Sequence, residues 1–104
     1  MQPSTRKHID ALRGDRLRFR RLYDQLQLRV RRHGGRYRPY VDDAMLDDAC
    51  SDAVMAVMVR YAGHFEAPAE HPETFDDALL GYLFNAACNC LMSALRRDAR
   101  ARRV

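Results

Sequence analysis

The chain of 104 residues has no tryptophan, only one lysine and only three cysteines. An odd number of cysteines does not suit a disulfide framework, and the first ten residues, MQPSTRKHID, lack the apolar core of a secretory signal. No apolar run is longer than residues 53–59, which is too short to span a bilayer. These absences predict a protein of the reducing cytoplasm with no membrane-spanning segment.

Several kinds of catalytic and metal site are missing as well. The chain has no glycine-rich phosphate loop and no recognisable arrangement of serine, histidine and aspartate. Cys88 and Cys90 point in different directions on an expected helix, and no histidine stands at zinc-site spacing, so buried apolar thiols account better for the cysteines. Helix capping explains the paired carboxylates at 42–43 and 47–48. The sequence therefore predicts no enzyme and no metal or cofactor site.

The net charge of +4 is unevenly distributed along the chain. Residues 1–41 hold twelve basic residues and three acids, residues 42–78 hold ten acids and only Arg60, and residues 79–104 hold five arginines and only Asp98. This layout predicts either two surfaces of different charge or solvated faces that attract one another in the fold. All but one of the 18 basic residues are arginines, which suit phosphate recognition, although a G+C-rich genome gives the same bias.

Apolar residues recur every three or four positions in three long stretches, which is the spacing of amphipathic helices. The stretches cover residues 15–33, residues 42 or 43 to 62, and residues 74–103. A pair of glycines, Gly34 and Gly35, is expected to end the first of them. The third is predicted to begin at a capping box formed by Thr74 and Asp77.

The remaining segments complete the expected domain. Residues 63–73 contain two prolines and are predicted to form a loop. Residues 1–14 are expected to be flexible or to form a short helix capped at Ser4 or Thr5. The chain is therefore predicted to be all-α: a compact three- to four-helix bundle over residues 15–101, followed by a basic tail at 102–104.

The helix expected over residues 42–62 carries a second line of side chains opposite its inward apolar stripe. This line begins acidic and ends apolar, with Asp48, Ser51, Asp52, Met55 and Val59 at helical spacing. A bundle of so few helices has little left to cover it, so we expect this line to bind a partner. In the loop that follows, Phe65 either stacks on a nucleic-acid base or fills the end of the bundle.

Two motifs in this order resemble region 2 of bacterial sigma factors, especially the extracytoplasmic-function group. They are LDDACSDAVMAVMVRY at residues 46–61 and YLFNAACNCLMSALRR at residues 82–97. The family carries DAEDLVQEVFLRVW and then WLFRIARNLALDLLRR at these places. FRRLYDQLQLRV at residues 19–30 resembles the helix that opens region 2, so the likeness covers about residues 16–101. The matching positions include Asp48, Asp52, Tyr82, Leu83, Phe84, Ala87, Asn89, Leu95, Arg96 and Arg97.

The resemblance implies a cytoplasmic transcription factor that binds core RNA polymerase at its clamp coiled coil. The implied polymerase-binding residues are Asp47, Asp48, Ser51, Asp52, Met55 and Val59. The resemblance also implies contact with the melted −10 promoter element, through arginines on phosphates and polar groups on an unstacked base. The implied DNA-binding residues are His64, Phe65, Tyr82, Asn85, Asn89, Arg96, Arg97 and Arg100.

The sequence also departs from the family pattern. Cys88, Ser93 and Tyr82 replace the family's arginine, aspartate and tryptophan, and no region 4 follows, so a second chain is expected to supply other promoter contacts. Five carboxylates near the loop would repel DNA unless they point away: Glu66, Glu70, Glu73, Asp76 and Asp77. Two alternatives therefore stand beside the sigma-like interpretation. One is a protein-interaction adaptor or accessory regulator of polymerase that does not read DNA, and the other is a small basic nucleic-acid binder.

Overall fold

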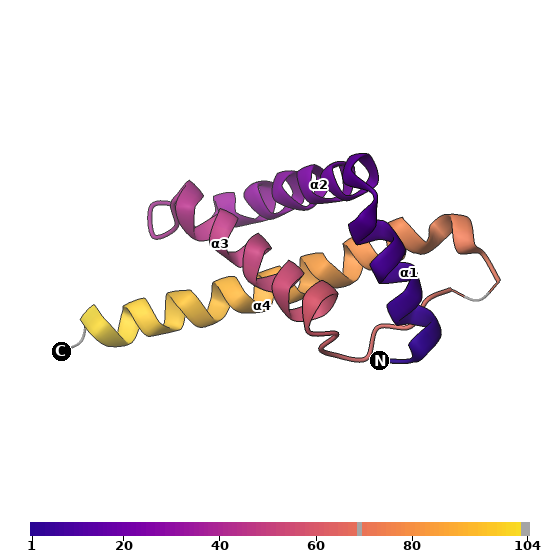
Figure 1. The fold of residues 1–104 in the computed structure, drawn as a ribbon. Coiled ribbons are helices and arrows are strands. Elements are labelled where there is room, and N and C mark those ends of the chain that lie inside the picture. Colours follow the sequence, from indigo (N-terminus) through magenta and orange to yellow (C-terminus); the bar gives the residue numbers. More distant parts are fainter. Residues whose placement is uncertain (69, 103–104) are drawn as a thin grey trace.

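The computed structural model describes residues 1–68 and 70–102, and within these every regular element is helical (Figure 1). The prediction of an all-α bundle of three or four helices is confirmed. Residues 103 and 104, at the end of the predicted helix and basic tail, lie outside the described residues. The elements are α1 (Pro3–Gly14), α2 (Arg16–Gly34), η1 (Gly35–Tyr37), α3 (Asp43–Val54), η2 (Met55–Val59), η3 (Pro72–Thr74) and α4 (Phe75–Arg102).

Helix α1 is packed into the fold and contacts the long loop that precedes α4. It begins at Pro3 with Gln2 as its N-cap, and a proline is tolerated there because the first N–H groups of a helix have no partner inside it. The expected cap at Ser4 or Thr5 is therefore wrong. The side chain of Thr5 is buried instead, and its hydroxyl accepts a hydrogen bond from the backbone N–H of Ala67 at 3.1 Å.

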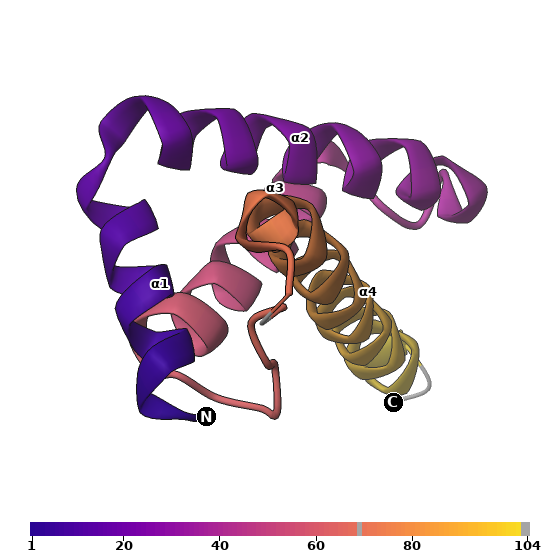
Figure 2. The same cartoon turned by 90° about the vertical axis from the view of Figure 1, so that its right-hand side faces the viewer.

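Helix α2 crosses α3 and α4 and meets α1 at a corner. Helices α3 and α4 lie on the inner side of this corner (Figure 2). Its buried residues are four apart, at Leu22, Leu26, Val30 and Gly34, and so form one narrow stripe toward α3 and α4. At Gly34 the backbone of α2 comes close to α3. A Cβ atom on this residue would overlap the side chain of Leu46 in α3. The last turn of α2 therefore requires glycine for packing.

Helix α3 and the π-helical turn η2 form one rod that leads into the loop. The carboxylate of Asp42 caps its start by accepting a hydrogen bond from the backbone N–H of Met45 at 2.9 Å. The sequence predicts an ordinary helix to residue 62, but the hydrogen bonds widen to the π pattern over Met55–Val59. Tyr61 then adopts a left-handed φ of 54°, which ends the rod and turns the chain.

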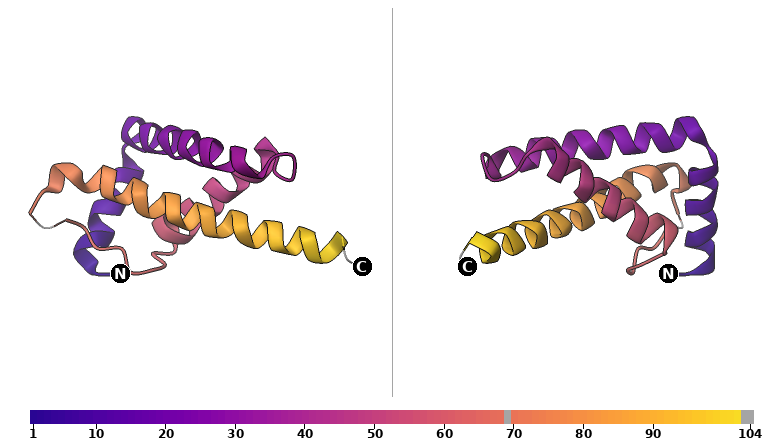
Figure 3. Two further views of the ribbon diagram at one scale, coloured as in Figure 1. Left: turned by 180° about the vertical axis from the view of Figure 1, so that it is seen from behind. Right: turned by 60° about the vertical axis from the view of Figure 1, so that its left-hand side comes forward.

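Helix α4 passes beneath α2 and beside α3, and its last turns project beyond them (Figures 1 and 3). With 28 residues it is about 42 Å long, which explains the elongated extents of 49 × 23 × 21 Å. Its buried residues end at Leu91, so the turns that follow have no core of their own. The buried residues of α4 are Phe75, Leu79, Leu80, Leu83, Ala87 and Leu91.

Helix α4 also contains a long apolar stretch. Together with η3 it is long and apolar enough, by length and composition, to cross a membrane, with a mean hydropathy of 1.5 in one 18-residue window. Sequence analysis looked only for unbroken apolar runs and did not predict this. About 28% of that window is buried against α2 and α3, and the core helix of a globular protein meets the same criterion.

Candidate interaction surfaces

Five of the six residues predicted to bind a partner protein form a line on the solvent side of α3 and η2. Asp48, Ser51 and Asp52 are exposed, and the side chains of Met55 and Val59 are 43% and 41% exposed. A methionine and a valine this exposed and one turn apart make a small apolar patch, which is informative on a helix of this size. The outer line of α3, as we call these five residues, is therefore a free surface in the described chain.

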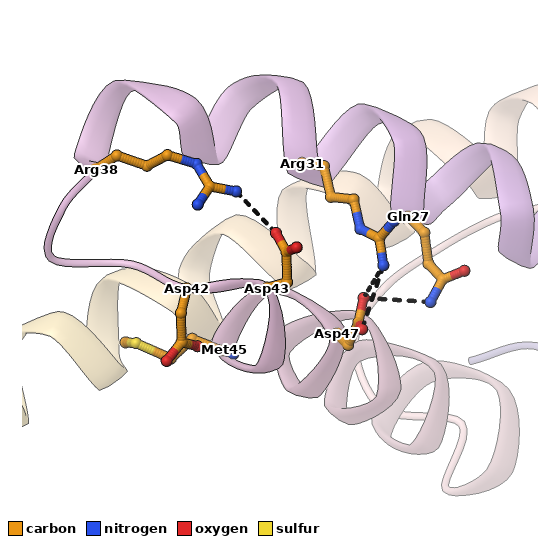
Figure 4. Close-up of polar contacts among 7 residues, drawn as sticks. All are labelled: Gln27, Arg31, Arg38, Asp42, Asp43, Met45 and Asp47. Carbon is orange, nitrogen blue, oxygen red and sulfur yellow. Dashed lines mark hydrogen bonds and ion pairs between the residues drawn. The ribbon is translucent and has the colours of Figure 1, made fainter.

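Asp47, the sixth predicted residue, faces α2 instead (Figure 4). Its carboxylate accepts hydrogen bonds from the Arg31 guanidinium at 3.1 Å and from the Gln27 amide at 3.3 Å. One turn earlier Asp43 pairs with Arg38 at 2.7 Å. These partly exposed ion pairs each contribute at most about 1 kcal/mol, but they fix the angle at which α3 crosses α2. Asp47 is thus engaged within the fold.

An apolar groove of about 270 Å³ separates the outer line of α3 from α2. Phe19 of α2 forms its far wall, held by a stacked contact with Tyr23 at a centroid distance of 6.0 Å. Arg13 closes one end, where its guanidinium donates a hydrogen bond to the Met58 carbonyl at 2.8 Å. Neither Phe19 nor Arg13 was among the residues that the sequence predicted for a binding surface. The groove is lined by Arg13, Phe19, Val54, Met55 and Val59.

A second, cationic groove of about 500 Å³ lies on the other side of the outer line, between α3 and α4. Asp52 supplies the α3 wall, and the rest comes from the second half of α4. Among the described residues Arg96, Arg97 and Arg100 form no ion pair, so their charges are available to an anion. The groove is lined by Asp52, Asn89, Cys90, Ser93, Arg96, Arg97 and Arg100.

The three cysteines are unpaired; Cys50 is buried, and Cys88 and Cys90 are half-buried. Burial raises the pKa of the Cys50 thiol to about 11, and it also raises the pKa values of Cys88 and Cys90. For Cys90 the carboxylate of Asp52 raises the pKa further, while the Arg97 guanidinium lowers it. All three thiols are therefore protonated at neutral pH. The described residues contain no group of three or more side chains that could hold a metal ion.

Of the two predicted DNA-binding residues of the loop, Phe65 helps to build the end of the bundle, whereas the side chain of His64 is exposed. Phe65 is only 6% exposed, with its ring against Phe75 at 5.8 Å and Tyr82 at 5.3 Å. The backbone N–H of His64 donates to the Tyr82 hydroxyl at 3.1 Å, and Gly63 has a left-handed φ of 89° where that ring passes. Phe65 is therefore a core residue, the second of the two roles expected for it, and it is removed from the candidate surface.

The remaining predicted DNA-binding residues do not form one site. Asn89, Arg96, Arg97 and Arg100 meet in the cationic groove, whereas Tyr82 lies about 20 Å away along the helix axis from Arg97. Asn85 is exposed on α4 but is not one of the residues that line the groove. The structure thus brings the arginines next to Asp52 of the outer line and separates them from the loop residues.

One of the five carboxylates near the loop, Asp76, has a cationic partner, and a second, Glu73, lies beside a histidine. The Arg18 guanidinium binds the carboxylate of Asp76 through Nε at 2.9 Å and through Nη2 at 2.6 Å. This hydrogen bonding raises the pKa of Arg18. The carboxylate of Glu73 lies 3.3 Å from the ring of His71. The repulsion that these acids would exert on a phosphate backbone is reduced accordingly.

The fold and its surfaces define a small all-α protein with an apolar groove on one side of α3 and a cationic groove on the other. A comparison with family models, curated proteins and solved structures found no match to this chain. Its function is therefore inferred from the grooves themselves and from the motifs that form them.

Proposed function

We propose that this protein is a transcription factor resembling sigma factor region 2. It binds core RNA polymerase through the outer line of α3 and contacts melted promoter DNA through the cationic groove. The observation that carries the proposal is the exposure of Met55 and Val59 beside Asp48 and Asp52, on the helix whose motif resembles the polymerase-binding helix of that family. A second chain supplies the remaining promoter contacts.

The chemistry of the outer line fits the proposed contact with a helical coiled coil. An apolar side chain of the partner in the groove beside Phe19 would cover the exposed parts of Met55 and Val59, which is worth about 1 kcal/mol for each. Asp48 and Asp52 offer two carboxylates one turn apart to basic residues of the same partner helix. The apolar end supplies affinity and the acidic end fixes the direction in which the partner helix lies.

The nucleic-acid half of the proposal rests on the cationic groove. Arg96, Arg97 and Arg100 are held by a rigid helix and have no anionic partner among the described residues, which is the arrangement that phosphate binding requires. Asn89 adds an amide that can hydrogen-bond to a base edge. Because the outer line and this groove share Asp52, polymerase and DNA would be neighbours on the protein.

Binding of purified core polymerase tests the first half. Asp52→Arg and Met55→Glu should each abolish capture of polymerase, because one reverses a contact charge and the other puts a carboxylate into an apolar contact. Asp24→Arg, a charge reversal at an exposed position of α2, is the matched control and should bind as the unmodified chain does. Failure of the unmodified chain to bind polymerase would refute the proposal.

Substitution of arginines in the cationic groove tests the nucleic-acid half of the proposal. Arg96→Ala combined with Arg97→Ala should leave polymerase binding intact and weaken engagement of melted promoter DNA. If transcription is unchanged by this double substitution, the protein is an adaptor or accessory regulator of polymerase. That alternative is favoured by Asp52, whose carboxylate opposes phosphate inside the groove. Tight, strongly salt-dependent binding of free DNA without polymerase binding would instead identify a basic nucleic-acid binder.

A further inference from the structure

A hollow of about 260 Å³ lies between the projecting end of α4 and the connector that follows α2. It is on a different side of α4 from the cationic groove, because Leu95, Ala99 and Arg102 follow one another at helical spacing away from the positions of the groove arginines. None of the predicted site residues contributes to it. The hollow is lined by Tyr37, Tyr40, Leu95, Asp98, Ala99 and Arg102.

The aromatic walls of the hollow are fixed in place before anything binds. The ring of Tyr37 meets the edge of His33 at 5.8 Å, and His33 in turn meets the edge of Phe84 in α4 at 5.6 Å. The backbone N–H of Tyr40 donates to the Tyr37 carbonyl at 2.8 Å, which closes one turn and sets the two tyrosines relative to each other. Little conformational entropy would therefore be lost when a ligand enters.

The chemistry of the hollow suits a flat π system. Tyr40 is 59% exposed, so its ring is accessible to a planar group. The guanidinium of Arg102 lies over one face of this ring at 5.4 Å, and a base would stack on the other face or in place of the guanidinium. Leu95 and Ala99 give an apolar floor, and Asp98 puts a carboxylate at the rim where an exocyclic amine could donate to it. A purely aliphatic ligand would use neither the ring face nor the carboxylate.

Arginines on the same turns of α4, facing another side of the helix, supply cations for the phosphates of a nucleotide. Arg96, Arg97 and Arg100 lie on the same two turns as the floor of the hollow and are unpaired among the described residues. A strand that places a base against Tyr40 would therefore have cations within reach of its phosphates. In a duplex both faces of each base are covered by stacking, so only an unpaired base can enter.

We propose that this hollow is a stacking site for one unpaired base of a single-stranded nucleic acid, with the base on Tyr40 and the flanking phosphates on the arginines of α4. This site would add to the nucleic-acid contacts of the proposed function, and most of its residues lie outside the two motifs that resemble sigma region 2. It does not depend on polymerase, and it can be tested with the purified chain alone.

The test uses two short single strands of equal length and charge. One is an oligothymidylate that carries a central 2-aminopurine, whose fluorescence is quenched when it stacks, and the other is abasic at every position. The unmodified chain should quench the first probe and bind the second about tenfold more weakly, because stacking on an aromatic side chain is lost. Tyr40→Ala should abolish the quenching and make the two affinities equal, whereas Tyr40→Phe, which keeps the ring face, should preserve both effects.

Three results would overturn the proposal. They are equal affinity of the unmodified chain for the two probes, quenching that survives Tyr40→Ala, and absence of binding to either probe at low salt. Circular dichroism of the Tyr40 variants checks that the helices are retained, which is expected for an exposed side chain. Met55→Glu separates this site from the proposed function, because Met55 does not line the cationic groove. This variant should lose polymerase and still distinguish the two probes. A chain that distinguishes the probes but never binds polymerase would refute the proposed function and leave the base site standing.

Discussion

Gly34 is the residue where the packing of α2 on α3 is tightest. A methyl group there would overlap the side chain of Leu46, which is itself fully buried and has little room to move. We expect Gly34→Ala to lower the free energy of unfolding by about 1–3 kcal/mol, as overpacking of a core does. Gly35→Ala is the matched control, because nothing lies within 4 Å of the added Cβ atom. Urea unfolding of the two variants measures the difference, and equal stability would contradict the close approach.

Cys50 should make stability depend on alkaline pH. Its thiol has a pKa of about 11 in the folded chain, because burial disfavours the thiolate, and an ordinary value of 9.0 when exposed. Between these values the unfolded chain holds fewer protons than the folded one, so the stability contributed by Cys50 is fully present below pH 9 and is lost as the pH rises toward 11. Unfolding free energies of the unmodified chain and of Cys50→Ala should therefore converge over this range. Parallel curves would show that the thiol is not buried.

The roles of single residues could be predicted from the sequence only in part. Exposure of Asp52, Met55 and Val59 follows from helical spacing alone, because these positions lie opposite the apolar stripe. Asp47 differs from Asp48 by one position, yet one faces α2 and the other faces solvent. That difference depends on where α2 crosses α3, and periodicity within α3 carries no information about it.

At the level of whole elements, local rules predicted the helices well. Apolar spacing, the cap at Asp42 and the two glycines after residue 33 placed α2, α3 and α4 within a few residues of their observed bounds. The π turn at η2 was not predicted from apolar spacing. For Phe65 the sequence left two roles open, because its place in the core depends on contacts with Phe75 and Tyr82, which are distant in the chain. For the same reason the sequence did not reveal that the arginines of α4 face Asp52.

The projecting end of α4 should be dispensable for folding. Its buried residues end at Leu91, and the half-buried Leu95 is the last apolar side chain against the core. Deleting residues 98–104 should therefore change the free energy of unfolding by less than about 1 kcal/mol, because it removes exposed side chains and only weak contacts. Thermal unfolding followed by circular dichroism measures this. Loss of the cooperative transition would show that these turns stabilise the bundle.

At the scale of the whole molecule, the three segments of the sequence that are basic, acidic and basic in turn have different electrostatic partners. Some acids of the middle segment pair with arginines of the first: Asp43 with Arg38, Asp47 with Arg31, and Asp76 with Arg18. The arginines of the last segment remain without such partners among the described residues. The middle acids therefore pair with some arginines of the first segment, whereas the described arginines of the last segment stay available.

The salt dependence of nucleic-acid binding should show which arginines contact phosphate. If the three arginines of the cationic groove each neutralise one phosphate of a single strand, the logarithm of the binding constant should fall against the logarithm of salt with a slope of about −2. Each of Arg96→Ala, Arg97→Ala and Arg100→Ala should reduce this slope by about 0.7. Arg60→Ala removes the same charge at an exposed position after η2 and should leave the slope nearly unchanged. An equal effect of Arg60→Ala would mean that binding follows net charge only.

The free end of α4 has a consequence for how such a protein can change over time. Since no side chain between Leu91 and the last described residue, Arg102, is buried, substitutions in these turns carry almost no folding penalty. Ligand preference at that end can therefore drift from one descendant sequence to the next while the three-helix scaffold behind it stays the same.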